Sequence, residues 1–159
     1  MSFFESLQDS AFTDWLLGSE SIWAYPTVLT LHTVGLAVLV GASTVLQLRL
    51  LGVGTSVPLA RLRMLYTLIW LAFAVNLASG VALFVTQAAD RVLQPLFYIK
   101  LSSIAVALWL GQEAKRSIFD RPPADGHVPV VRRRKAVVVL GLWTAAIVSG
   151  RLMAYFSGR

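Results

Sequence analysis

The sequence predicts an all-α integral membrane protein, a four-helix bundle with an amphipathic helix at its N-terminal end. Its composition is the first observation: 57% of the 159 residues are hydrophobic and only 14% are charged. Soluble domains are usually about 45–50% apolar and about 25% charged. The second observation is four apolar runs, each long enough to meet the roughly 20 residues that a bilayer span needs. Helices suit such runs because they satisfy their own backbone hydrogen bonds without water.

The four predicted spans account for most of the chain. They cover approximately residues 25–51, 62–87, 94–114 and 136–156. Connections between the spans are short, so we expect residues 1–159 to form a single transmembrane domain.

The segment before the first span has a pattern of its own. Residues 2–17 place apolar side chains at helical spacing among acidic ones, which predicts an amphipathic helix lying in the outer membrane interface. Its simplest role is an interfacial anchor, and the alternative is a lid over an outward-facing pocket. Because the segment has no basic start of the kind that signal peptides have, we expect the first span to remain in the mature protein.

Charge asymmetry predicts the topology. Residues 1–20 contain four acids and no Lys or Arg, whereas the first and third connections are basic, and residues 132–135 read RRRK. Positive loops stay on the cytoplasmic side, which predicts a bacterial inner membrane protein with both termini in the periplasm. The net charge of +6 then reflects topology and anionic lipid headgroups, and no nucleic-acid partner is expected.

Three ionisable residues lie well inside apolar runs, namely His32, Lys100 and Arg151. An ionisable group at such depth is costly, so a functional role is the default hypothesis. At 1.5 Å per residue, each lies about 7–9 Å from the outer end of its span, and Asn76 lies nearer the middle of the bilayer. The competing explanations are snorkelling of Lys100 and Arg151 and an interhelical hydrogen bond for His32.

Steps of three and four residues define a stripe of small and polar residues on each span. Membrane helices use such stripes to approach closely, so we expect them to face inward. The stripes contain His32 on the first span, Asn76 on the second, Lys100 on the third and, on the fourth, Gly141, Thr144, Val148, Arg151 and Tyr155.

A neutral imidazole beside two cations favours an anionic or electron-rich ligand. Haem b fits this description, with His32 on the iron and with Lys100 and Arg151 on the propionates. Only one histidine lies in a span, because His127 belongs to the inner basic loop. A second ligand from Met153, a haem shared across a dimer and a five-coordinate haem are the alternatives. A quinone is the second candidate, with His32 on its carbonyl and the cations stabilising its reduced forms.

Copper is the third candidate, with His32 and either Met153 or Met1 as ligands. The nearby Lys100 and Arg151 would repel a cation. The absence of cysteine excludes thiolate metal sites, iron–sulfur clusters and covalent c-type haem. The sequence contains no catalytic motif, so an enzymatic activity is left open.

Short motifs on several spans carry a family resemblance. They are His32-x-x-Gly35 and Gly41 with Arg49-Leu50-Leu51-Gly52, then Tyr98-Ile99-Lys100-Leu101, then Ser149-Gly150-Arg151-Leu152-Met153-Ala154-Tyr155-Phe156. The chain resembles an uncharacterised family of bacterial four-helix inner-membrane proteins and is more distantly similar to the CopD-like copper-resistance membrane domain. The second resemblance implies copper handling with a periplasmic partner.

The expected function is a membrane redox subunit that holds haem b or a quinone in the outer half of the bundle. His32, Lys100 and Arg151 would build the site, supported by Asn76 and Met153. The alternatives are a copper-handling protein working with a periplasmic partner and a cofactor-free membrane anchor or assembly subunit. The bilayer is the expected environment, and a periplasmic or membrane protein partner and a homo-oligomer are both compatible with the sequence.

Overall fold

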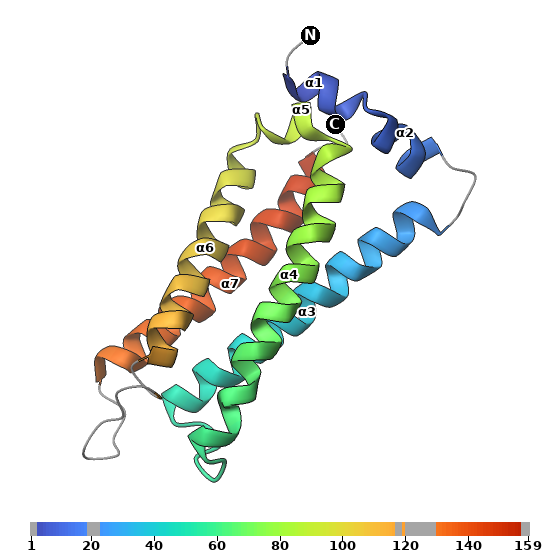
Figure 1. Cartoon of the computed structure of the whole chain (residues 1–159). Helices are drawn as coiled ribbons and strands as arrows, with labels where there is room; N and C mark the ends of the chain where they lie inside the picture. The colour runs from blue at the N-terminus through green and yellow to red at the C-terminus, as the bar shows by residue number, and fades with distance from the viewer. Residues whose placement is uncertain (1–2, 19–22, 117–118, 120–129, 157–159) are drawn as a thin grey trace.

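Four long helices build the molecule, as the sequence predicts. The structure is a computed structural model that describes residues 3–18, 23–116, 119 and 130–156. The long helices are α3 (Ala24–Leu51), α4 (Arg63–Val85), α6 (Pro95–Lys115) and α7 (Val130–Phe156). Each is long and apolar enough to cross a membrane, and the described residues contain no strand. The prediction of an all-α membrane four-helix bundle is confirmed (Figure 1).

The helix ends follow local signals in the sequence. Helix α3 ends at Gly52, whose φ of +100° suits glycine, and the amide of Gly52 bonds to the Arg49 carbonyl. A 3₁₀ turn, η1 (Leu59–Leu62), precedes α4. Helix α6 begins at Pro95, which the first turn tolerates because its backbone donors have no intrahelical partner. The bounds match the predicted spans within two residues, except that α7 begins at Val130.

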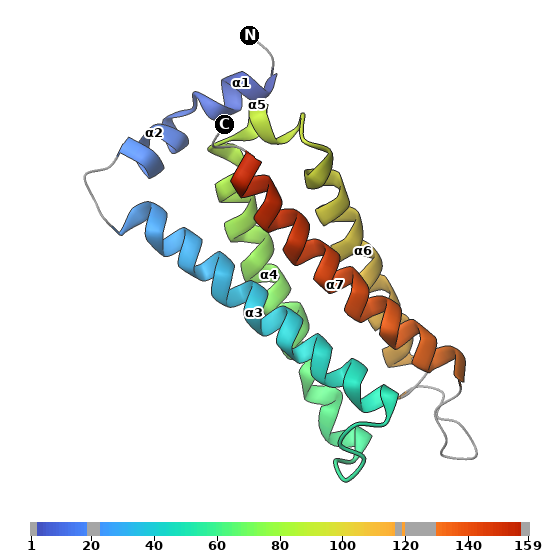
Figure 2. The ribbon, with the colours of Figure 1, turned by 180° about the vertical axis from the view of Figure 1, so that it is seen from behind.

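The four spans form two closely packed pairs. Helix α4 packs along α3, α7 packs along α6, and contacts between α3 and α7 join the two pairs. Helices α4 and α6 meet only sparsely within the described residues. Figures 1 and 2, which view opposite sides, show α4 and α6 on one face of the bundle and α3 and α7 on the other.

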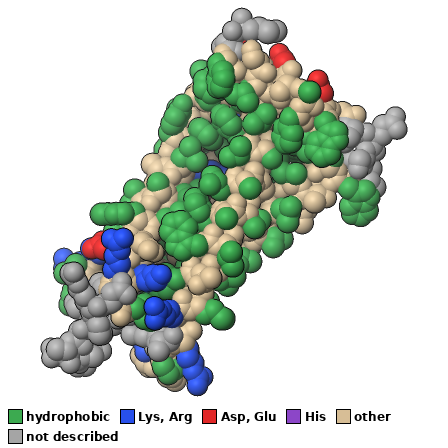
Figure 3. Space-filling model, in the orientation of Figure 1, with side chains coloured by type: hydrophobic (Ala, Val, Ile, Leu, Met, Phe, Trp, Pro, Cys, Tyr) green, Lys and Arg blue, Asp and Glu red, His purple; other side chains and the backbone are tan. Residues whose placement is uncertain are grey.

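The core lies where the two pairs meet. Its largest fully buried side chain is Trp143 of α7, whose indole nitrogen donates to the hydroxyl of Ser43 on α3 at 2.8 Å. Buried side chains from all four spans surround it, including Leu39, Leu46, Tyr66, Ile69, Ala107 and Val139. Large apolar side chains stay exposed on the outer faces of the spans, as expected for surfaces that meet lipid tails. Figure 3 shows such side chains over the face that carries α4 and α6.

Three of the four predicted stripes face inward, and the prediction for the fourth span is wrong. Helix α7 buries Ala136, Val139, Trp143, Ala146, Ser149 and Met153. The predicted residues Gly141, Thr144, Val148, Arg151 and Tyr155 are partly or largely exposed to the outside of the bundle. This rotation of α7 buries its largest side chain, Trp143, in the core, where its indole nitrogen donates to Ser43.

The N-terminal segment forms two short helices instead of one. They are α1 (Phe3–Gln8) and α2 (Ala11–Gly18). The hydroxyl of Ser10 accepts a hydrogen bond from the amide of Thr13 at 3.4 Å, and such a cap starts a new helix. The prediction of one continuous helix over 2–17 is therefore wrong.

A short helix in the second connection, α5 (Ala88–Arg91), lies under α1. The side-chain oxygen of Gln8 accepts a hydrogen bond from the amide of Ala89 at 3.2 Å. Figure 1 shows α1, α2, α5 and the end of α7 together at one end of the bundle. Helix α1 is thus docked on the connection between α4 and α6.

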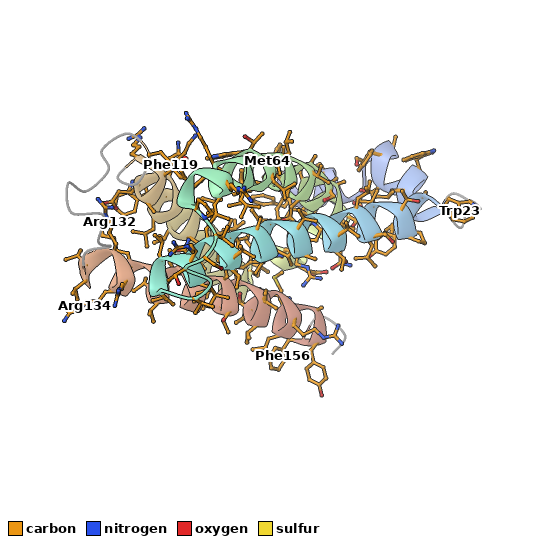
Figure 4. All side chains as sticks on the ribbon, turned by 90° about the horizontal axis from the view of Figure 1, so that it is seen from below. Trp23, Met64, Phe119, Arg132, Arg134 and Phe156 are labelled. Atoms are coloured by element: carbon orange, nitrogen blue, oxygen red, sulfur yellow. The ribbon has the colours of Figure 1, made fainter. Side chains whose placement is uncertain are left out.

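Basic side chains gather at the opposite end of the bundle. Figure 3 shows most of the visible Lys and Arg side chains there. Figure 4 shows Arg132 and Arg134 at the same end as Phe119, far from Trp23 at the start of α3. The charge asymmetry of the sequence is therefore an asymmetry between the two ends of the folded bundle.

Candidate functional site

Two glycines make room for His32 between α3 and α4. A Cβ atom on Gly35 would lie 3.3 Å from the backbone nitrogen of Asn76, so glycine allows α4 to approach α3 closely at this level. A Cβ atom on Gly80 would lie 3.1 Å from Cε1 of His32. The imidazole therefore occupies a slot that a larger residue at either position would narrow.

The proton of the imidazole belongs on Nδ1. This nitrogen lies 3.1 Å from the backbone oxygen of Asn76 and 3.2 Å from the hydroxyl oxygen of Ser79. The Asn76 oxygen only accepts, and Ser79 donates its own proton to the Val75 carbonyl at 2.7 Å. The side-chain nitrogen of Asn76, a donor, lies farther from Nδ1, at 3.4 Å, and donates to the His32 backbone oxygen at 2.8 Å. The two shorter contacts therefore assign the proton to Nδ1. Nε2 has no hydrogen-bond partner among the described residues, so its lone pair is available.

Asn76 fixes the histidine from a second direction. Its side-chain nitrogen donates to the backbone oxygen of His32 at 2.8 Å, and only 6% of the residue is exposed. The backbone and the side chain of Asn76 thus both contact His32, and they tie α4 to α3 at the level of the imidazole.

Lys100 reaches the same level from α6. Its side chain crosses Gly150 of α7, where a Cβ atom would lie 3.5 Å from both Cδ and Nζ of Lys100. Gly150 therefore leaves the space through which the half-buried lysine passes toward the middle of the bundle.

Two cavities meet at His32 and Lys100. The first, the lateral groove, has a volume of about 360 Å³ and lies between α4 and α6. The second, the outer cavity, has a volume of about 220 Å³ and extends toward α5. Both are lined by His32, Gly80, Phe84, Phe97 and Lys100.

A pair of aromatic rings bridges α4 and α6 where the cavities meet. The rings of Phe84 and Phe97 stack with their centroids 5.2 Å apart and their planes 17° apart. The lateral groove extends from this pair past Leu77 and Leu101 to Phe73 and is otherwise apolar except at Asn76, His32 and Lys100. Figure 3 looks onto this face, where hydrophobic side chains surround a hollow between α4 and α6.

Arg91 of α5 lines the outer cavity. Its guanidinium donates to the backbone oxygen of Met153 at 3.1 Å and to the side-chain oxygens of Gln87 and Gln94. Burial lowers the pKa of Arg91, while the charge of Asp90 acts in the opposite direction. Arginine keeps its proton at neutral pH all the same.

Among the described residues that line the two cavities, the charged side chains are all basic. They are Lys100 and Arg91, and no described Asp or Glu side chain lines either cavity. A cavity lined by one sign of charge with apolar walls concentrates ligands of the opposite sign. The site therefore suits an anionic or electron-rich ligand with a large apolar part.

The structure brings together four of the five residues that the sequence analysis selected. His32 and Lys100 line both cavities, Asn76 lines the lateral groove, and Met153 lines the outer cavity. Arg151 does not join them, because it lies exposed on α7 about 200° around the helix from Met153. The predicted grouping of Arg151 with His32 and Lys100 is not found. Met1 and His127 lie outside the described residues.

Sequence reasoning missed Arg91. Arg91 lies in a connection between two spans, where a positive charge is normally interpreted only as a signal for membrane orientation. One signal does single it out: Gln87 and Gln94 flank Arg91 at spacings of four and three residues, and both side chains accept its hydrogen bonds.

The described residues contain no group of three or more His, Asp or Glu side chains that could hold a metal ion. Comparisons of the chain with protein-family models, with curated proteins and with solved structures found no match.

Proposed function

We propose that this chain is a membrane redox protein that holds haem b at His32, in the outer half of the bundle. One observation carries the proposal: Nδ1–H of His32 donates to the Asn76 carbonyl, which leaves Nε2 with a free lone pair at the junction of two cavities. Histidines that bind metals characteristically donate their other ring N–H to a carbonyl or carboxylate, which fixes the ring and makes the ligating nitrogen more basic.

The other residues around His32 are suited to the ring and the propionates of haem b. Phe84 and Phe97 supply flat apolar contact, and the groove of about 360 Å³ meets the outer cavity of about 220 Å³ at His32. Lys100 and Arg91 would pair with the two propionates, and Arg91 takes the role first expected of Arg151. A haem b held here would supply one-electron transfer.

A quinone is the second candidate, and the position of the lateral groove favours it. The groove lies between two helices that pack only sparsely, on an apolar face of the bundle. A quinone headgroup would accept a hydrogen bond from Lys100, a quinol would donate one to Nε2 of His32, and the isoprenoid tail would follow the groove toward lipid.

Copper handling has weaker support from the geometry. Its donor set would be His32 with Met153, which both line the outer cavity. Lys100 and Arg91 line the same cavity and repel a bare cation. A cofactor-free anchor or assembly subunit is the remaining alternative.

The charge asymmetry supports a location in a bacterial inner membrane. Under the positive-inside rule, the basic end faces the cytoplasm, and α1, α2 and the outer cavity face the periplasm. A redox partner would then dock at the periplasmic end, either as a periplasmic or membrane protein or through a second copy of this chain.

The absorption spectrum of the purified protein tests the proposal. The chain, purified in mild detergent from haem-replete cells, is expected to show a Soret band that a pyridine haemochromogen assay identifies as haem b. The band should disappear in His32→Ala and persist in the matched control His127→Ala, which removes the other histidine. A colourless protein without iron would exclude haem. Chromatography of the extracted lipids and elemental analysis then separate a bound quinone from copper, and finding neither favours the anchor.

A further inference from the structure

A small cavity with several polar side chains in its lining lies in the inner half of the bundle, apart from His32. It has a volume of about 20 Å³ and lies where α3, α4, α6 and α7 converge. The side chains with polar groups in its lining include Ser43, Gln47, Tyr66, Gln112 and Trp143. Polar groups from four helices around so small a space are unusual in a bundle that otherwise packs apolar side chains at this level.

Several of these polar groups have unused hydrogen-bonding capacity. Oε1 of Gln112 is buried and has no hydrogen-bond partner in the described part of the chain. Gln47 is 2% exposed and Tyr66 is 4% exposed, and neither side chain has a hydrogen bond to another described residue. Buried polar groups in proteins are almost always hydrogen-bonded to protein or to ordered water. All three side chains line the cavity, so a water molecule there would lie beside each of them.

The cavity has the size and the chemistry of a water site. A cavity needs roughly 10–15 Å³ of this kind of volume to hold one water molecule, which takes two to four polar partners. The volume of about 20 Å³ meets the first condition. The side chains of Gln47, Tyr66 and Gln112, which all line the cavity, supply the polar groups for the second.

Gln47 also lines a cavity at the basic end of the bundle. This second cavity has a volume of about 210 Å³ and is also lined by Arg132 and the ion pair of Glu113 with Lys135. This second cavity lies at the end of the bundle where Figure 4 shows Arg132. The two cavities thus have the Gln47 side chain in common in their linings.

We propose that the cavity between Gln47, Tyr66, Gln112 and Trp143 binds water, and that the water reaches it past Gln47 from the basic end of the bundle. The inner half of this membrane protein is then hydrated as far as Trp143. The proposal does not depend on the ligand at His32.

Hydroxyl-radical footprinting by X-ray radiolysis tests the proposal on the wild-type chain in lipid nanodiscs. Radicals form from bound water and modify the side chains beside it. Trp143 and Tyr66 are expected to be modified faster than Trp109, a lipid-facing control that is 65% exposed in the bundle. Modification of Trp143 and Tyr66 at or below the level of Trp109 would overturn the proposal.

Two substitutions sharpen the test. Gln47→Leu is expected to slow modification of Trp143, and an unchanged rate would overturn the proposed access path. Gln112→Met removes the buried oxygen at similar volume. It should lower the melting temperature if water bridges that oxygen, and a rise would mean that the oxygen lies unpaired in a dry cavity.

Discussion

Asn76 shows how one polar residue can organise a membrane site. Its backbone oxygen accepts from the imidazole, while its side chain donates to the backbone of His32. Because the two bonds use different parts of the residue, a substitution can separate them. The side-chain bond supports the packing of α3 on α4, and the backbone bond holds the tautomer of the histidine.

Asn76→Ala is therefore expected to destabilise the protein and to keep the ligand site. Loss of an interhelical hydrogen bond between membrane helices costs about 0.5–2 kcal/mol. The carbonyl stays in place, so the Soret band of the proposed haem should persist below the melting temperature. Thermal unfolding followed by circular dichroism measures the first effect, with Thr144→Ala as the exposed control. Loss of the band in a folded variant would show that the amide itself is needed.

Gly80→Ala probes the slot around the imidazole. The added Cβ atom would lie 3.1 Å from Cε1 of His32, closer than side chains normally pack. The ring must shift, and the expected result is a displaced or weakened Soret band in a folded protein. Gly41→Ala is the matched control, because a Cβ atom there meets nothing within 4 Å. A spectrum identical to wild type would contradict the assignment of this ring as the ligand.

At the scale of single helices, the Trp143–Ser43 contact joins the two helix pairs through the core. Trp143→Phe removes the indole donor and leaves a small void, so we expect a loss of about 1–3 kcal/mol in unfolding free energy. Trp109→Phe on the lipid-facing side of α6 should cost much less. Thermal or denaturant unfolding of the two variants in one detergent checks the difference. Equal losses would mean that the buried bond adds nothing to the stability.

The spans were predictable because hydropathy and length depend on the chain alone. Helix rotation was predictable only where small or polar residues dominate one face, as they do around His32 and Asn76. On α7 the sequence pattern favours the stripe through Arg151 as strongly as the face that is buried. The buried face is instead the one that carries Trp143, whose partner Ser43 lies on α3. No pattern within α7 carries that information.

Short elements escaped prediction for a different reason. Ser10 divides the N-terminal segment with one capping bond, and Arg91 enters the site from a helix of only four residues. A helical hydrophobic periodicity can be recognised only over several turns. It therefore predicts neither the break at Ser10 nor the short helix that carries Arg91. The candidate site was thus predictable at His32, Lys100 and Asn76, and the position of Arg91 depended on the tertiary fold.

At the scale of the whole molecule, the ends of the bundle differ in charge, and this predicts a fixed orientation in the membrane. The chain has no cysteine, so single-cysteine variants give unambiguous labelling. An impermeant maleimide added to intact spheroplasts should modify Asp9→Cys and spare Thr55→Cys, because both side chains are exposed and lie at opposite ends. Lysed cells provide the control, in which both variants react. The reverse pattern would contradict the proposed orientation.

The sparse contact between α4 and α6 has a consequence for assembly. Each closely packed pair is a hairpin of two consecutive spans, and the hairpins meet mainly through α3 and α7, while the Phe84–Phe97 pair bridges α4 and α6. The lateral groove lies along the side where α4 and α6 meet only sparsely. A ligand bound there would join the two hairpins and stabilise the assembled protein in proportion to its affinity and concentration. Binding of the cofactor would then be the last step of folding. Without the cofactor, the groove between α4 and α6 would remain accessible to proteases and to other membrane proteins.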